Sequence, residues 1–249
     1  MLHVRPEVFM LIFIRLGAAV MFLPYVGGIG RRAWYAVFAA AASWALYPLV
    51  AARLASWHPS SAGELAILAV EQFVVGTMVG LWTRIAVAAF EMSGQIVGFQ
   101  MGFAVANVFD PTTGLHGSVV AHLESLVAAL VFFGADLHHV FISALLQGIG
   151  SEPGIFANSN IALGLAQYAG KMFEASLMLS APVIAALFLS KIALAILTRA
   201  VPQINAFIFG FPITIGLGLI MLALAFPQMA MTMRSFLGEA VRLVAVVGH

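Results

Sequence analysis

Long apolar segments separated by short polar breaks cover almost the whole chain. Leu, Ala and Met are abundant within them, and the alternation of apolar and polar residues that marks β-strands is absent. The pattern therefore predicts an all-α chain of membrane-associated helices. The apolar segments lie at residues 8–29, 33–57, 65–90, 91–109, 119–150, 161–198 and 204–233.

The breaks between these segments are polar and rich in glycine, proline and serine. One of them supplies Ser60 or Ser61 as the N-cap of the helix that follows. No linker or low-complexity tract divides the chain, so we interpret residues 1–249 as a single domain. The breaks lie at residues 27–32, 56–64, 107–118 and 151–160.

Two apolar segments are longer than a single membrane crossing requires. A helix needs about 20 residues to span a bilayer, and residues 119–150 and 161–198 exceed that length. Each segment either tilts or bends into a helical hairpin, and Pro182 could kink the second because proline removes a backbone donor. The segment at residues 8–29 is longer than the apolar core of a signal peptide and contains Arg15, so we expect a retained first helix.

The composition places the chain in a membrane. Of its 249 residues, 63% are hydrophobic and only 8% are charged, whereas soluble domains carry about a quarter charged residues. A net charge of +1 offers no basic surface for nucleic acid, and the absence of cysteine excludes disulfides and thiolate metal sites. Arg31 and Arg32 form the densest positive loop, which predicts that this loop is cytoplasmic and that the N-terminus lies outside.

Charged residues interrupt the apolar segments themselves. An ion at the centre of a helix in lipid costs about 2.5–3.5 kcal/mol, so we expect protein, water or a pore to shelter these groups. Lys171 and Glu174 stand three residues apart and form a candidate buried ion pair on one helical face. The interrupting residues are Arg15, Glu71, Arg84, Glu91, Glu124, Asp136, Lys171, Glu174, Lys191 and Arg199.

Small residues recur at intervals of four in several places, and Gly76 and Gly80 form the shortest of these runs. Gly94, Gly98 and Gly102 fall on one helical face, which allows another backbone to approach closely. This face packs within the chain, packs against other subunits or forms a small-residue pore wall. Gln100 adds a polar group that lipid could not satisfy. Another such place is residues 198–218, where Pro202, Gln203, Asn205 and Pro212 accompany a small face formed by Gly210, Thr214 and Gly218.

The region at residues 198–218 has two interpretations. The prolines free backbone carbonyls that Gln203 and Asn205 could meet. The region is then either a kinked helix that packs within the chain or a polar joint at a seam between subunits.

The break at residues 107–118 also has two interpretations. Asp110 precedes Pro111 and disfavours helix there, so the stretch is either a surface loop or a loop that lines or blocks a cavity.

Enzyme and metal interpretations find little support in the sequence. Ser118 and His122 have the spacing of a dyad but lack an orienting carboxylate. Asp136, His138 and His139 could suggest a metal site, but adjacent histidines point about 100° apart on a helix and no HExxH motif is present. We therefore expect a protein without catalytic residues, cofactor or metal.

Two blocks of the sequence, GQIVGFQMGFAVANVFDP at residues 94–111 and LTRAVPQINAFIFGFPITIGLGL at residues 197–219, closely resemble the flagellar biosynthetic FliR family. The resemblance implies a core subunit of the flagellar type III protein export gate, located in the bacterial inner membrane at the flagellar basal body. It implies a fold in which a FliP-like part is fused to a FliQ-like part, built from helical hairpins. It also implies assembly with FliP, FliQ and FlhB, contact with membrane lipid, and passage of exported flagellar proteins.

The resemblance also assigns candidate site residues. The family's pore plug falls on the loop Asn107, Val108, Phe109, Asp110, Pro111, Thr112, Thr113, Gly114, Leu115, His116 and Gly117. Candidate subunit-packing residues are Gly94, Gly98, Gln100, Gly102, Pro202, Gln203, Asn205, Gly210 and Pro212. The alternatives to this function are an ion-coupled secondary transporter, which also uses broken helices and buried ions, and the equivalent subunit of a virulence type III secretion system.

Overall fold

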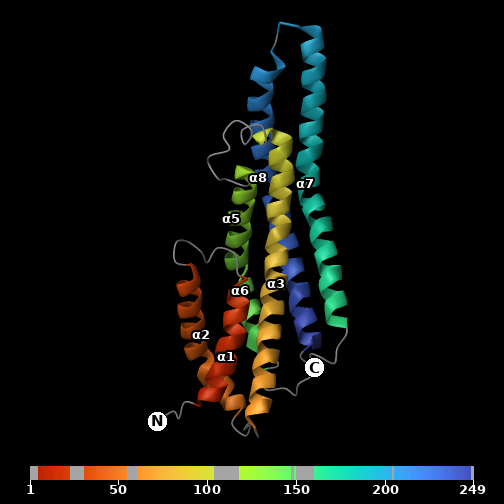
Figure 1. Cartoon of the computed structure of the whole chain (residues 1–249). Coiled ribbons are helices and arrows are strands. Elements are labelled where there is room, and N and C mark those ends of the chain that lie inside the picture. Colours follow the sequence, from red (N-terminus) through yellow and green to blue (C-terminus); the bar gives the residue numbers. More distant parts are fainter. Residues whose placement is uncertain are drawn as a thin grey trace. The chain divides into compact units, whose positions relative to one another are not determined.

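The computed structural model describes residues 5–22, 31–54, 61–103, 118–146, 149, 160–203 and 205–247. Every regular element in these residues is a helix, which confirms the predicted all-α class. The helices, labelled in Figure 1, are α1 (Pro6–Val20), α2 (Arg31–Arg53), α3 (Ala62–Met101), α5 (Val119–Gly134), α6 (Leu137–Leu146), α7 (Asn160–Ala200) and α8 (Ala206–Val247).

Three helices are longer than the predicted segments. Helix α3 continues through Glu91 for 40 residues, so the predicted division between residues 65–90 and 91–109 is wrong, because a single charged side chain does not interrupt a helix. Helix α7 runs unbroken for 41 residues with Pro182 inside it, so this segment is not a hairpin by itself. Helix α8 extends to Val247 and contains Pro212 and Pro227.

The described part of residues 119–150 is neither a single tilted helix nor a helical hairpin, because the helix breaks and bends by 69°. Helix α5 ends at Gly134, and α6 begins at Leu137. Asp136 lies between them in the left-handed region with φ of 57°, a conformation that aspartate adopts more readily than most side chains. The N-cap prediction holds at the start of α3, where the N–H of Glu64 donates to Oγ of Ser61 over 3.2 Å.

Four helices are long and apolar enough to cross a membrane, judged on length and composition in the described residues. The bent pair of α5 and α6 would bring the number to five if it forms one span. These helices agree with a multi-pass membrane protein. The four candidate spans are Tyr35–Ala52, Ala62–Met101, Ala166–Ala200 and Ile208–Phe236.

The chain divides into two compact units. The first unit contains Met1–Ile85, Asp136–Tyr168 and Ser235–His249, and the second contains Ala86–Ala135 and Ala169–Arg234. Helices α3, α7 and α8 each contribute residues to both units. The expected single domain therefore contains two packing regions, and each is described by itself below.

In the first unit, α1 lies beside α2 (Figure 1). Val8, Ile12 and Ala19 are fully buried on one face of α1. This face meets α3, because a Cβ at Gly80 of α3 would overlap the backbone of Ala19. The start of α1 is tied to α2 because the backbone N–H of Arg5 donates to the hydroxyl of Tyr47 over 2.7 Å.

A charged residue is buried where α1 meets α3 in the same unit. Arg15 is only 3% exposed, and its Nη1 donates to Oε1 of Gln72 over 3.0 Å. Glu71 is equally buried and interacts electrostatically with Arg15. The close approach of the two helices depends on Gly76, because a Cβ at that position would overlap the backbone carbonyl of Arg15. The predicted sheltering of Arg15 and Glu71 is confirmed within the chain itself.

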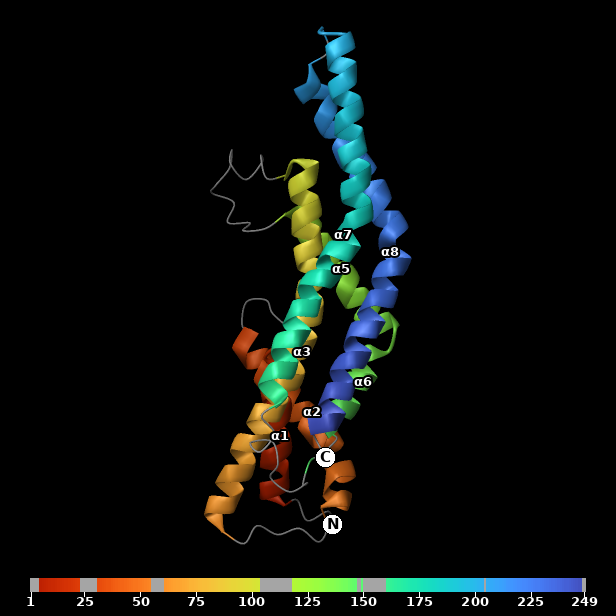
Figure 2. The same cartoon turned by 90° about the vertical axis from the view of Figure 1, so that its right-hand side faces the viewer.

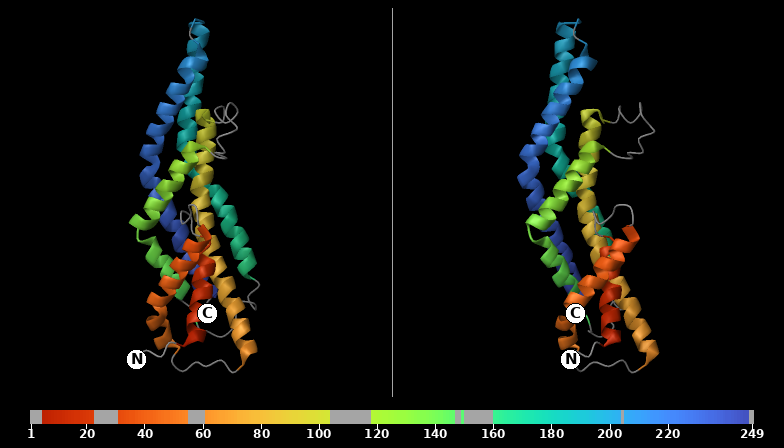
Figure 3. Two further views of the ribbon diagram at one scale, coloured as in Figure 1. Left: turned by 60° about the vertical axis from the view of Figure 1, so that its left-hand side comes forward. Right: turned by 90° about the vertical axis from the view of Figure 1, so that its left-hand side faces the viewer.

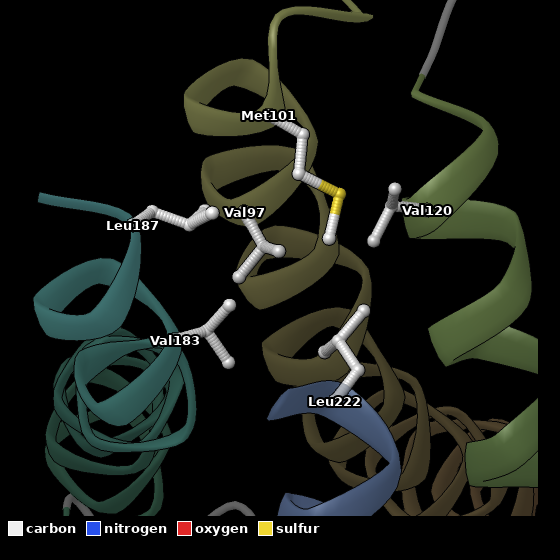
Figure 4. Packing of buried hydrophobic residues seen from close by; sticks show 6 residues of the cluster. All are labelled: Val97, Met101, Val120, Val183, Leu187 and Leu222. Carbon is white, nitrogen blue, oxygen red and sulfur yellow. The ribbon is translucent and has the colours of Figure 1, made fainter. Parts of the chain in front are cut away.

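The second unit packs parts of four helices around one apolar cluster. Figure 4 shows its side chains pointing toward one another from α3, α5, α7 and α8. Helices α7 and α8 run side by side here (Figure 2), and α5 lies along α3 (Figure 3). The buried members of the cluster are Val97, Met101, Val120, Val183, Leu187 and Leu222.

Candidate functional site

The candidate site is the place where the chain leaves α3 and returns as α5, within the second unit. The predicted plug loop, residues 107–117, lies outside the described residues. The described residues nearest to it are Phe103 on one side and Ser118 on the other, and the contacts next to them show how the chain is held where it leaves α3 and enters α5.

The exit from α3 is shaped by a glycine. Gly102 has a φ of 97°, a conformation that L side chains rarely adopt. Its N–H donates to the carbonyl of Phe99 over 3.1 Å. The ring of Phe211 from α8 lies so close to Gly102 that a Cβ would overlap it. The backbone conformation and the neighbouring ring therefore both require glycine at this position.

The last turn of α3 is also bonded to α8. The hydroxyl of Thr214 donates to the carbonyl of Met101 over 3.1 Å. It also lies 3.2 Å from the carbonyl of Phe211, three residues earlier on α8. Thr214 is only 7% exposed. Gly218, one turn further along α8, makes room for the side chain of Met101, which a Cβ there would overlap. Thr214 and Gly218, on successive turns of α8, thus hold the end of α3.

The return from the loop is fixed by Ser118, the N-cap of α5. Its Oγ accepts the N–H of Val120 over 3.2 Å, which satisfies one of the free donors at the helix start. Ser118 also lies directly against Gly98 of α3, where a Cβ would overlap its side chain. The two ends of the loop are therefore anchored on neighbouring turns of the same helix.

The glycine face of α3 continues this contact. A Cβ at Gly94 would lie 2.6 Å from Cα of Ala121 on α5. Gly94 and Gly98 thus pack on α5 of the same chain, and Gly102 packs on α8. This arrangement corresponds to the interpretation of packing within the chain. A role of these glycines in contacts with other subunits stays a prediction.

Gln100 makes a polar contact with α7. Nζ of Lys191 donates to Oε1 of Gln100 over 2.8 Å, on the exposed surface of the second unit. The charge of Lys191 therefore has a hydrogen-bond acceptor on a neighbouring helix. Sequence reasoning identified both residues as polar groups in apolar segments but did not pair them.

The region at residues 198–218 forms the turn of a helical hairpin and the start of α8. Helix α7 ends at Ala200 and α8 begins at Ala206, with Pro202 in the turn between them. A Cβ at Gly210 would lie 3.0 Å from Cδ2 of Leu194 on α7. Pro202, Gln203, Asn205 and Pro212 are all exposed, so the contacts predicted for them with other subunits stay predictions.

Several charged residues are not sheltered by the chain. Lys171 and Glu174 are both exposed, so the described residues do not bury the predicted ion pair. Asp136, Lys191 and Arg199 are exposed as well. Any burial of these groups would have to come from outside the described residues.

Sequence reasoning missed the residues that hold the loop ends. Phe211 and Thr214 contact residues at the end of α3 that lie more than one hundred positions away in the sequence. Met101 and Thr214, for example, are 113 positions apart. The available signal was the small face of Gly210, Thr214 and Gly218, which indicated a close neighbour without identifying it. Ser118 also carried a signal, because a serine before an apolar run is typical of an N-cap.

The chemical groups at the site act as structural contacts. Ser118 accepts a backbone N–H as a cap, which explains the residue without a dyad with His122. Elsewhere, the structure brings Asp136, His138 and His139 together, although their directions were expected to diverge. Their potential ligand atoms all lie within 4.8 Å of one another.

Comparisons with known proteins agree with the sequence resemblance. Residues 7–240 match the family described as "Bacterial export proteins, family 1". Flagellar biosynthetic protein FliR of Pectobacterium carotovorum is 39% identical over 64% of this chain and 62% of its own length. The Bacillus subtilis protein of that name is 32% identical over 73% of this chain and 74% of its own length. The Escherichia coli protein is 34% identical over 72% of this chain and 69% of its own length.

The match covers all seven helices named above, apart from the first residue of α1 and the end of α8. It therefore includes both units and the contacts at the two loop ends. The chain belongs to the FliR family of bacterial export proteins, a family of flagellar export-apparatus components rather than enzymes, and it is a multi-pass membrane protein.

Proposed function

We propose that this chain is a core subunit of the flagellar type III export gate and that residues 107–117 close its channel. Unfolded flagellar proteins pass through a pore that the chain helps to build. The loop obstructs that pore until export begins. The FliR family membership supports this function, and the anchoring of the two loop ends supports the role of the loop.

The observation that carries the proposal is the independent fixing of both loop ends. Gly102 and Met101 are held by α8 before the loop, and Ser118 caps α5 and contacts Gly98 after it. A segment that closes a pore must stay in place against a pressure or ion gradient. Anchors on packed helices supply that resistance, whereas an ordinary surface connection does not need them.

The outer faces of α7 and α8 support assembly with other subunits. Large apolar side chains are exposed along both helices, and lipid or protein must cover them. Exposed charges on α7, such as Lys171 and Glu174, favour protein or water over lipid on part of that surface. The exposed apolar residues include Phe188, Leu189, Ile196, Ile208 and Phe209.

We assign this surface to FliP, FliQ and FlhB, in the inner membrane at the flagellar basal body. In this proposal the two units act together as one export-gate domain. The chain combines a FliP-like part with a FliQ-like part, and the α7–α8 hairpin is one of its helical hairpins.

The proposal is tested by replacing residues 107–117 with a glycine–serine segment of equal length. The variant is co-expressed with FliP, FliQ and FlhB, and the purified assembly is placed in a planar lipid bilayer. We expect normal co-purification and a higher ion conductance than that of the unmodified assembly. A matched control replaces residues 151–159, the connection before α7, in the same way and should leave the conductance low.

Two results would contradict the proposal. If the assembly forms normally and its conductance is unchanged, residues 107–117 do not close the channel. If the chain does not co-purify with FliP or FliQ under conditions in which they associate with each other, the proposed gate assembly is wrong.

A further inference from the structure

The break between α5 and α6 gathers three potential metal ligands that have no part in the proposed gate. Asp136 directly precedes α6, and His138 and His139 lie in its first turn. All three belong to the first unit. Each offers one ligand atom, and these atoms lie within 4.8 Å of one another.

The turn itself explains why the three side chains meet. Asp136 precedes the helix in a left-handed conformation, so its side chain does not follow the direction that a helical residue would take. The N–H of His139 donates to the carbonyl of Asp136 over 3.0 Å and fixes the turn. Nδ1 of His139 then lies 3.6 Å from Oδ1 of Asp136, and the rings of His138 and His139 are 4.1 Å apart between centroids.

The ligand set selects a chemical class of ion. Two imidazoles and one carboxylate suit Zn²⁺, Ni²⁺ or Cu²⁺, whereas Mg²⁺ and Ca²⁺ prefer oxygen ligands alone. Ligand atoms bound tetrahedrally to Zn²⁺ stand about 3.4 Å apart, given bond lengths of about 2.0–2.1 Å. Asp136 and His139 are exposed, and their Oδ1 and Nδ1 atoms, 3.6 Å apart, are already close to that separation.

We propose that Asp136, His138 and His139 form a binding site for a divalent transition-metal ion, with Zn²⁺ as the favoured ion. The chain supplies three ligands, and the remaining position is filled by water or by a group from a neighbouring molecule. The bound ion links Asp136, which precedes α6, to His138 and His139 at the start of that helix. Its role is structural, because the ion holds Asp136 against α6 and thereby stabilises the start of that helix.

The experiment uses the full chain in detergent, purified with a tag that contains no histidine and treated with a chelator. Zn²⁺ binding is measured by isothermal titration calorimetry, and Co²⁺ is added separately because its visible absorption reports the ligands. We expect one Zn²⁺ per chain and a Co²⁺ spectrum of mixed nitrogen and oxygen ligation. His138→Ala and His139→Ala should each weaken Zn²⁺ binding by at least about tenfold.

Two further variants make the test specific. Asp136→Asn removes the carboxylate but keeps a side chain that tolerates the left-handed conformation, and it should also weaken binding. His122→Ala removes an exposed histidine on α5 and should leave the affinity unchanged. Circular dichroism of each variant verifies that its helix content equals that of the parent chain.

The proposal is overturned if the parent chain binds no Zn²⁺ at micromolar concentrations. It is also overturned if a variant that lacks all three side chains binds as much Zn²⁺ as the parent. Neither result depends on export activity, so the metal site and the gate function are tested separately.

Discussion

The hydroxyl of Thr214 on α8 donates a hydrogen bond to the carbonyl of Met101 on α3 over 3.1 Å. Met101 is the last residue of α3, and the carbonyls of a final helical turn have no partner within their own helix. The side chain of Thr214 therefore completes the hydrogen bonding of α3 at the point where the loop begins. This contact links the position of α8 to the position of the loop.

Thr214→Val should destabilise the protein and loosen the loop. Valine has nearly the same shape but cannot donate, so the buried carbonyl of Met101 loses a partner at a cost of about 1–3 kcal/mol. We expect a lower thermal unfolding temperature of the full chain in detergent and a higher leak conductance of the assembled gate. Thr214→Ser keeps the donor and should stay close to the parent in conductance. Equal conductance of the valine and serine variants would contradict a role of the hydrogen bond in holding the loop.

Gly102→Ala should be costly for two separable reasons. The φ of 97° strains any L side chain by about 1–3 kcal/mol, and the ring of Phe211 occupies the space that a Cβ needs. The free energy of unfolding should fall, and adding Phe211→Ala should not restore it because the backbone strain remains. The single variant Phe211→Ala gives the change in the free energy of unfolding that comes from losing the ring alone. Full recovery in the double variant would show that only the steric overlap matters.

Glycine positions on packed and open faces should respond in opposite ways. Gly98→Ala places a Cβ on Ser118 and should lower both stability and the yield of the assembled complex. Gly216→Ala on α8 meets no atom within 4 Å, so it should be neutral or should stabilise the helix by up to about 1 kcal/mol. Thermal unfolding and native gels measure the two effects. An unchanged complex yield in Gly98→Ala would refute the close contact between α3 and α5.

The Lys191–Gln100 contact should contribute little to stability. It lies on the exposed surface, where water competes for the ammonium group, and exposed contacts of charged side chains typically contribute about 0.2–1 kcal/mol. A double-mutant cycle of Lys191→Met and Gln100→Ala in the full chain measures their coupling energy. We expect a coupling below about 1 kcal/mol. A larger value would indicate that other groups desolvate this pair.

The helical class and one helix cap could be predicted because they depend on local patterns. The apolar segments and a serine cap at Ser60 or Ser61 follow from residues close in sequence, whereas the sequence did not locate the break at Asp136. The continuity of α3 past Glu91 was missed because a charge was interpreted as a boundary, although charged residues favour helices as well as most others do.

The contacts at the loop ends could not be derived from local patterns. A small face predicts that another backbone approaches, but the partner depends on the register between helices that are distant in sequence. Thr214 could have faced any helix until its distance to Met101 was known. For the same reason, Arg15 and Lys171 look alike in the sequence, yet the chain buries the first and exposes the second.

The anchoring of Gly102 and Ser118 has a consequence for how the family can vary. The contacts that hold these two residues come from α3, α5 and α8, outside residues 104–117. Lengthening a connection between fixed points costs little, about 0.6 kcal/mol for each doubling of its length. Insertions and substitutions in this stretch are therefore accessible to evolution without redesign of the helical frame.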